Sequence, residues 1–556
     1  MLRYIAIFSV LLSSFSVFAD SPIDRRALVE RHCPVLHEHD PLAPLTVGNG
    51  EFAFTADITG LQTFPDAYRD GIPLSTQSNW GWHTFPNPED FQLANAMREY
   101  DAQGRKVPYA STTSNDAGKW LRENPHRLGL GHIGFVFTKE DETGATIGDL
   151  QAIQQKLDLW SGVLHSRFEL EGQPVEVTTA CDPHTDLLAV RVVSPLIRLG
   201  RLKVSFRFPY GSGRFGKEPE DWTRPDAHET QIVERKKGSS QLLRTLDGDS
   251  HYVLITHSPS CRFDETSEHD FQLTPSPEKN EIEFSTAFSP QRFRDESPEV
   301  SETLSASGEK WEQFWMTGGA IDFSGSTDSR APELERRVVL SQYLAAIQCS
   351  GSIPPQETGL TFNSWYGKLH LEMHWWHAVH FALWGRIDLL EKSLPWYASI
   401  LPMAQKMARR QGYCGARWPK MIGPDGREGP SGVGVFLIWQ QPHPIYYAEL
   451  CYRAAPSEET LKRYRTLVFE TAEFMASYAH WNGDAKRYDL GPPLIPAQEC
   501  YDPETTCNPA FELEYWHWGL ATAQHWRERL DLPRDEDWEH VIENLALPEF
   551  EDGKYQ

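Results

Sequence analysis

The hydrophobic pattern of the chain changes its period near residue 303, and this change constrains the fold more than any other feature. Between about residues 45 and 300, short segments such as LLAVRVVS (187–194) and EIEFSTAF (281–288) alternate apolar and polar side chains. Alternation with a period of two indicates strands with one buried face, and many such strands in series are typical of an antiparallel β-sandwich. Polar loops between them, such as residues 112–120, are expected at the surface or at the rim of a site.

Beyond residue 303 the apolar residues recur with helical spacing, which predicts a second, helical half. The predicted helical segments of this half are residues 332–350, 372–386, 386–412, 434–454, 457–481, 508–530 and 535–547. An all-β domain followed by helix hairpins is therefore the predicted architecture.

Composition changes along the chain predict the domain boundaries. Arg3 precedes an apolar run that ends in Val17-Phe18-Ala19, which is the layout of a secretory signal peptide. We therefore expect an exported protein, either periplasmic or secreted. The predicted units are a signal peptide (1–19), a β-sandwich domain (20–305), a helical linker (306–330) that ends in a Gly/Ser/Asp-rich stretch, and a helical catalytic domain (331–556).

The charge and composition of the chain restrict its partners. The net charge of −25 argues against nucleic acid, because binding to phosphates depends on clustered Lys and Arg. No segment after the signal peptide approaches about 20 consecutive apolar residues, so we expect no membrane span. Nineteen Trp and 19 Tyr in an exported protein suggest a carbohydrate partner, since sugar faces stack on flat rings, although a large core also uses such residues. Nothing in the sequence indicates a cofactor, and the oligomeric state stays open.

The stretch KLHLEMHWWHAVHF (368–381) admits three interpretations: a metal site, core imidazoles and a sugar-contacting surface. His370, His374 and His377 differ by four and three positions, so they share one face of a helix, as metal ligands would. The spacing is not that of the H-E-x-x-H zinc proteases, and two adjacent tryptophans would crowd a hydrated ion. We therefore favour the sugar-contacting surface and predict no metal.

Glu499 lies in a proline-rich loop that precedes an aromatic helix. A carboxyl group held against aromatic walls is desolvated, which raises its pKa and suits it to protonate a leaving oxygen. An exposed loop glutamate without a role is the alternative. The loop also contains Cys500 and Cys507, the only two of the eight cysteines close enough in sequence to suggest a local disulfide.

Three stretches of the helical half resemble signatures of glycoside hydrolase family 65 and its six-hairpin relatives. The first is GKLHLEMHWWH, in the place of the family's G-H-x-F-W-D-x-E-x-F, and the second is GYCGARWPK, similar to G-Y-x-G-A-x-F-P. The third is IPAQECYDPETTCNPAFELEYWHW, in the place of G-P-D-E-Y-H and its following helix. The resemblance implies an N-terminal β-sandwich, a helical linker and an (α/α)6 barrel whose loops converge on one pocket.

This resemblance places Glu499 at the position of the family's general acid. It places Glu372 at the position of an aspartate that binds hydroxyls of the −1 sugar, and because Leu371-Glu372 replaces Trp-Asp here, specificity for α-glucosides does not follow. The further candidates for substrate binding are His374, Trp375, Arg417, Trp418, Lys420, Gln441 and His443. The implied mechanism is inversion, in which an acid and a base lie about 6.5–9.5 Å apart and the base activates a water molecule. In the phosphorylases of the family, phosphate is the nucleophile instead of water. Export favours water, so we expect a hydrolase.

A closed barrel of six hairpins needs six pairs of helices, whereas the sequence contains only about seven helical segments. We therefore expect an incomplete barrel from a truncated gene product, in which no residue can be identified as the general base. The first alternative function is an inactive carbohydrate-binding protein that lacks this base. The second is a metalloenzyme that uses the histidine cluster.

Overall fold

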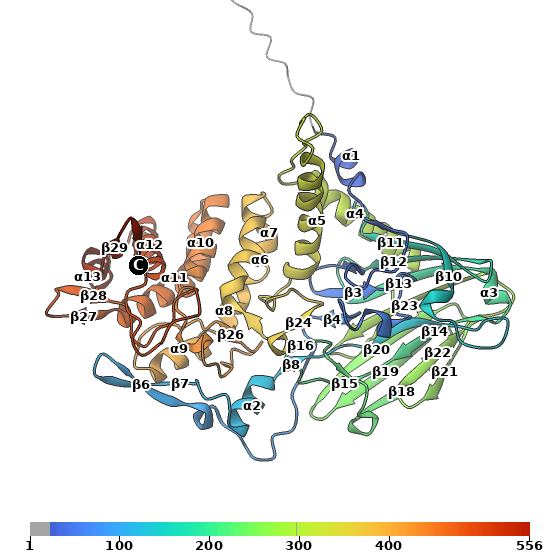
Figure 1. Cartoon of the computed structure of the whole chain (residues 1–556), viewed down its shortest axis with the longest axis horizontal. Coiled ribbons are helices and arrows are strands. Elements are labelled where there is room, and N and C mark those ends of the chain that lie inside the picture. The colour runs from blue at the N-terminus through green and yellow to red at the C-terminus, as the bar shows by residue number, and fades with distance from the viewer. Residues whose placement is uncertain (1–22, 296, 556) are drawn as a thin grey trace, which may run out of the picture.

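The computed structural model describes residues 23–295 and 297–555. The predicted signal peptide lies outside these residues. None of the helices in the described ranges is sufficiently long and apolar to cross a membrane. Figure 1 shows a strand-rich half on the right and a helical half on the left, joined near α4 (Val300–Met316) and α5 (Ala331–Cys349).

The first half contains a large antiparallel sheet that faces two smaller ones. The nine strands of the large sheet, in spatial order, are β1 (Val35–Leu36), β10 (Leu150–Asp158), β11 (Val163–Leu170), β12 (Gln173–Cys181), β13 (Leu187–Val193), β23 (Glu281–Ser289), β20 (Asp249–His257), β19 (Ser239–Leu246) and β18 (His228–Lys236). The second sheet contains β21 (Arg262–Ser267), β22 (Asp270–Thr274), β14 (Leu202–Arg207) and β9 (His132–Phe137). The third contains β2 (Leu45–Gly48), β3 (Phe52–Ala56) and β4 (Thr76–Ser78).

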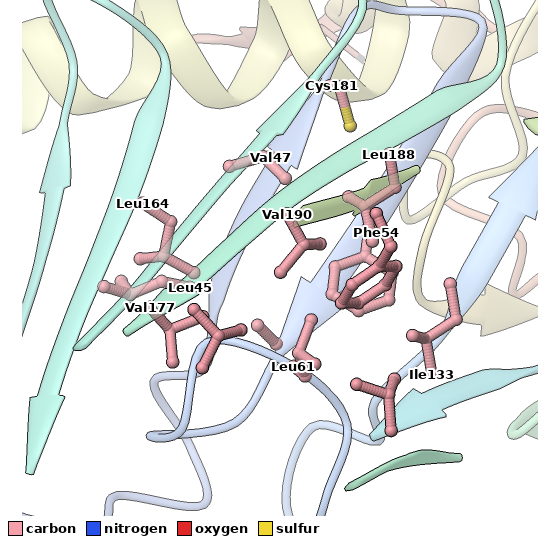
Figure 2. Packing of buried hydrophobic residues seen from close by; sticks show 14 of the residues in the cluster. Leu45, Val47, Phe54, Leu61, Ile133, Leu164, Val177, Cys181, Leu188 and Val190 are labelled. Atoms are coloured by element: carbon pink, nitrogen blue, oxygen red, sulfur yellow. The ribbon is translucent and has the colours of Figure 1, made fainter. Parts of the chain in front are cut away.

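Strand alternation decides which side chains enter the core of this sandwich. On β13, Leu188 and Val190 are fully buried in the cluster that includes Phe54 of the facing sheet (Figure 2). Phe206 of β14 and Phe284 of β23 join the sheets, with ring centroids 5.8 Å apart. The intervening β13 residues, such as Leu187, point to the other face, where α4 covers them. The predicted antiparallel sandwich is confirmed.

Helices of the second half form two layers. The helices are α5, α6 (Leu371–Leu383), α7 (Ile387–Glu391), α8 (Leu394–Ser399), α9 (Leu401–Arg410), α10 (His443–Ala454), α11 (Glu458–Tyr478), α12 (Ala510–Arg529) and α13 (Glu536–Asn544). In the first layer α6 contacts α10, which contacts α12, and α11 packs behind α10 and α12. Within the described part of the chain these helices do not close into a barrel, and the predicted order of a strand-rich half followed by a helical half is confirmed.

Prolines divide two segments that the sequence analysis treated as single helices. Residues 386–412 form α7, α8 and α9, and Pro395 and Pro402 lie in the first turns of α8 and α9. Proline lacks the N–H that a helix interior needs, so it starts a helix more easily than it continues one. Residues 437–442 are not helical, and α10 begins only at His443 after Pro442.

One segment of the sandwich half extends beneath the helical half. It contains β6 (Arg98–Ala102), β7 (Arg105–Tyr109) and α2 (Asp116–Glu123), which Figure 1 shows below the helices. The rings of Tyr100 and Tyr109 contact Phe436, at centroid distances of 4.8 and 5.0 Å. We call residues 93–123 the crossing segment. It places a wall from the first half against the loops of the second.

Candidate active site

Backbone pairing brings a lysine beside the first candidate glutamate. The short strands β25 (Leu369–His370) and β26 (Met421–Ile422) pair, and the Leu371 N–H donates to the carbonyl of Lys420 at 2.8 Å. The Lys420 ammonium consequently lies 3.3 Å from Oε1 of Glu372 and 2.5 Å from Oε1 of Glu499. One cation therefore joins carboxyl groups that lie 127 residues apart in the chain.

The Glu372 carboxyl group is almost inaccessible to solvent, with 3% of the residue exposed. Burial raises its pKa to about 8, although the Lys420 ammonium acts in the opposite direction. Its Oε2 has no hydrogen-bond partner among the described residues. The buried carboxyl of Glu372 therefore holds its proton more tightly than an exposed glutamate does. Burial disfavours the charge on Lys420, but the adjacent carboxyl groups raise the pKa of the ammonium overall, and Glu372 contributes its attraction only when it is ionised.

Glu499 occupies the tip of a loop and reaches solvent. Its backbone is in the left-handed region, with φ of 59°, and its N–H donates to the carbonyl of Pro496 at 2.9 Å. Glu512, the third residue of α12, accepts the Ala497 N–H at 2.8 Å and ties the loop to the helix. The Glu499 side chain is 37% exposed. The desolvated carboxyl that the sequence analysis expected at Glu499 is thus found at Glu372, on the other side of Lys420.

A cavity of about 170 Å³ lies against Glu499 and Lys420. The residues that line it are Thr113, Arg122, Trp365, Lys420, Met421, Ser431, Gly432, Val433, Gly434 and Glu499. The ring centroid of Trp365 is 5.5 Å from the Lys420 ammonium and 5.9 Å from the Arg122 guanidinium. An aromatic wall with polar and charged groups around it suits a sugar ring, which presents both C–H faces and hydroxyl groups.

The structure places most of the other candidate residues in the core. His374 contacts the Tyr397 hydroxyl at 2.9 Å and the Ser393 hydroxyl at 3.0 Å. Trp418 donates its indole N–H to Thr471 at 2.9 Å, and its backbone N–H donates to Gln441 at 2.9 Å. These side chains are buried and their polar atoms are engaged within the fold, so they support the loops around the cavity without lining it.

Arg417, His443 and Trp375 also lie away from the cavity. The Arg417 guanidinium is 1% exposed and donates to the side chain of Gln411 and to the carbonyl of Val435. His443 contacts the hydroxyl of Tyr515 at 2.9 Å and the carbonyl of Glu372 at 3.3 Å, so it steadies the backbone of a cavity element. Trp375 packs on Tyr446, with ring centroids 5.8 Å apart. Of the nine candidates, the structure thus groups Glu372, Lys420 and Glu499.

The histidines of residues 368–381 have separate partners. His370 contacts the carbonyl of Lys368 at 2.9 Å and His377 contacts the carbonyl of Glu357 at 2.9 Å. No group of three or more His, Cys, Asp or Glu in the described ranges is placed to hold a metal ion. All eight cysteines, which fall within those ranges, are unpaired, and Cys500 and Cys507 are exposed.

The sequence analysis did not identify Arg122 or Trp365 as cavity residues. Trp365 lies six residues before α6 begins at Leu371, and Arg122 lies two residues after the polar loop of residues 112–120, which was expected at the surface or at the rim of a site. An aromatic residue near a candidate stretch and a residue near a rim loop are each weak signals. Only the crossing segment brings them together, and the sequence does not reveal it.

Comparisons with known proteins give a structural likeness alone. No protein-family model matches the chain, and no curated protein does. Among solved structures, a human-microbiome protein named as a kojibiose phosphorylase matches 95% of this chain and 72% of its own length, with a TM-score of 0.65 and 8% identity. This likeness shows that the chain shares the fold of that protein. A bacterial glucoamylase complexed with acarbose matches 91% of this chain and 66% of its own, with a TM-score of 0.49 and 11% identity.

Proposed function

We propose that the chain is an exported carbohydrate-active enzyme that hydrolyses a glycosidic bond in the cavity beside Glu499. The observation that carries the proposal is the Glu372–Lys420–Glu499 cluster, in which one carboxyl group lines the cavity and a second, also in contact with the lysine, is buried and has a raised pKa. Lys420 and Glu499 of this cluster lie in loops between helices. The chain shares its fold with a protein named as a kojibiose phosphorylase. A perturbed carboxyl next to a cavity is typical of acid–base sites.

In the proposed mechanism Glu499 is the general acid. When a sugar fills the cavity, Lys420 gives a proton to Glu499 and takes one from Glu372, so the net charge of the cluster does not change. Glu499 then protonates the leaving oxygen as the bond from that oxygen to the anomeric carbon breaks. Water adds its hydroxyl group to the anomeric carbon, and the remaining proton of the water restores the cluster.

The separation of the two carboxyl groups restricts this scheme. Oε1 of Glu372 and Oε1 of Glu499 both contact the Lys420 ammonium, at 3.3 and 2.5 Å. The distance between these two oxygens therefore cannot exceed the sum of the two contact distances. An inverting enzyme separates its acid and base by about 6.5–9.5 Å to admit water. Glu372 is therefore too close to be the base of an inverting pair. We assign it the role of proton reserve.

One observation favours a second candidate function, a carbohydrate-binding protein without turnover. Glu499 is the only carboxylate that lines the cavity in the part of the chain that the structure describes. A base that directs water would have to come from elsewhere. In that case the cavity would bind a sugar and release it unchanged.

The experiment that separates the two functions is a panel of α- and β-glycosides assayed with the wild-type chain and with Glu499→Gln. We expect hydrolysis that falls by about 10²- to 10⁴-fold in the variant, the range for loss of a general acid. Glu504→Gln is the matched control, because Glu504 lies in the same loop and is exposed. Binding by wild type without turnover of any glycoside would contradict the enzymatic proposal.

The water-dependent step and export have their own tests. Assays with and without inorganic phosphate, with detection of sugar 1-phosphate, separate hydrolysis from phosphorolysis. Release of sugar phosphate would contradict the hydrolase. Fractionation of cells that express the full chain tests export, and recovery of uncleaved protein in the cytoplasm would contradict it.

A further inference from the structure

Arg122 is a cation in the cavity without a counter-ion. It lies in α2 of the crossing segment and lines the same cavity as Glu499. Arg122 is half-buried, and within the described residues its guanidinium makes no ion pair within 4 Å and no hydrogen bond, while its Nε is buried without a partner. A buried donor with no acceptor is costly, by about 1–3 kcal/mol, and more when it is charged. Such a group calls for an explanation in terms of a ligand.

The other cations around the cavity are already satisfied. Lys420 is bound by two carboxyl groups. Lys368 donates to the carbonyls of Asn124 and Pro125, at 2.8 and 3.0 Å, and burial lowers its pKa to about 7. Arg122 is thus the surplus positive charge of the cavity, in a chain whose net charge is −25.

We infer that the cavity takes an acidic sugar and that the Arg122 guanidinium binds its carboxylate. This inference rests on the proposed function, since it names the class of substrate for that site. Trp365 lies close to both cations, with its ring centroid 5.9 Å from the Arg122 guanidinium and 5.5 Å from the Lys420 ammonium. A uronic acid whose face stacks on this ring directs its carboxylate toward Arg122 and its glycosidic oxygen toward Glu499.

The chemistry of arginine supports a carboxylate rather than a hydroxyl group. Guanidinium presents a planar fork of N–H donors that matches both oxygens of a carboxylate, and such charge-assisted pairs are stronger than neutral hydrogen bonds. A neutral sugar would leave the guanidinium without a counter-charge. Loss of the pair should therefore reduce the preference for acidic sugars by about 10- to 100-fold.

The test compares the full-length wild type with Arg122→Gln and Arg122→Lys. Binding of 4-nitrophenyl glucuronides and galacturonides, and of the matching neutral glycosides, is followed by saturation-transfer NMR, which needs no turnover, and kcat/KM is measured in parallel. We expect wild type to prefer uronides, Arg122→Gln to lose this preference by 10-fold or more, and Arg122→Lys to retain part of it. Neutral glycosides should bind the same to all three proteins.

Lys119→Gln is the control, because Lys119 is exposed on the same helix and pairs with Asp116 at 3.4 Å. Unchanged melting temperature shows that each variant folds. Equal binding of uronides and neutral glycosides by wild type would overturn the inference, as would a preference that survives in Arg122→Gln. Binding of uronides without any hydrolysis would instead overturn the enzymatic proposal and leave the acidic sugar standing.

Inorganic phosphate forms a separate arm of the experiment, because it is also an oxyanion that arginine binds. If phosphate accelerates bond cleavage, and Arg122→Gln abolishes this effect while uronides show no preference, the anion is a second substrate. That result would overturn the acidic sugar. If phosphate competes only weakly with uronides, the carboxylate assignment is supported.

Discussion

Replacement of Glu372 by glutamine should change the way in which stability depends on pH. The pKa of Glu372 is about 8 in the folded protein, against an ordinary value of 4.5. Between these pH values the folded state binds a proton at this site that the unfolded chain has released. The free energy of unfolding therefore falls as pH rises, by about 1.4 kcal/mol for each pH unit at most. Glutamine cannot ionise, so this contribution to the slope disappears in Glu372→Gln.

The assay is urea unfolding followed by tryptophan fluorescence, at pH 5, 6, 7 and 8. The free energy of unfolding of wild type should fall relative to that of Glu372→Gln as pH rises toward 8. Above pH 8 the two free energies should change with pH in the same way. The difference in free energy of unfolding between the two proteins at a single pH is not the readout, because the amide N–H₂ of glutamine replaces an oxygen that has no partner and so changes stability by itself. Glu514→Gln, on the exposed side of α12, is the control. Equal slopes for wild type and Glu372→Gln would show that Glu372 is ionised when folded, which would remove the proton source from the mechanism.

The packing of the crossing segment and the state of the cysteines give two further predictions. Phe436→Ala should destabilise the chain by about 3–5 kcal/mol and make residues 93–123 accessible to trypsin, because Phe436 is 1% exposed and packs between two tyrosines. An unchanged rate of proteolysis would contradict this packing. Cys500, which is exposed, should react with Ellman's reagent in the native protein, and Cys507, whose pKa burial raises to about 11, should react more slowly. Cys181, which is buried and has a raised pKa, should react only after unfolding. Failure of Cys500 and Cys507 to react without a reductant would indicate a disulfide between them.

Local patterning was enough to predict the elements of this fold. Alternation over 187–194 and 281–288 predicts β13 and β23 closely, because a strand with a polar face and an apolar face leaves a period of two in the sequence. Residues 386–412 were harder, because periodicity continues through Pro395 and Pro402 while the backbone does not. Strand pairing and helix layers depend on contacts between distant residues, which a single sequence does not encode in any local pattern.

The candidate site was predicted in part. Glu372, Lys420 and Glu499 come from three stretches that were expected to converge, and they do. Residue type cannot tell whether a polar side chain points into a cavity or into a satisfied core position, which is why His374 lies among core partners. Arg122 could not have been found, because nothing in its own neighbourhood of the sequence shows that it meets the second half of the chain.

The crossing segment and the helical half contribute different parts of the proposed site. Glu372, Lys420 and Glu499 all come from the helical half, whereas Arg122, the proposed contact to the substrate's charge, lies in α2 of the sandwich half. Mutations within residues 93–123 could therefore redirect substrate choice while the reacting groups are inherited unchanged. Selection can act on the two properties separately, and a graft of this one segment from a homologue would be the smallest genetic exchange that transfers a new preference.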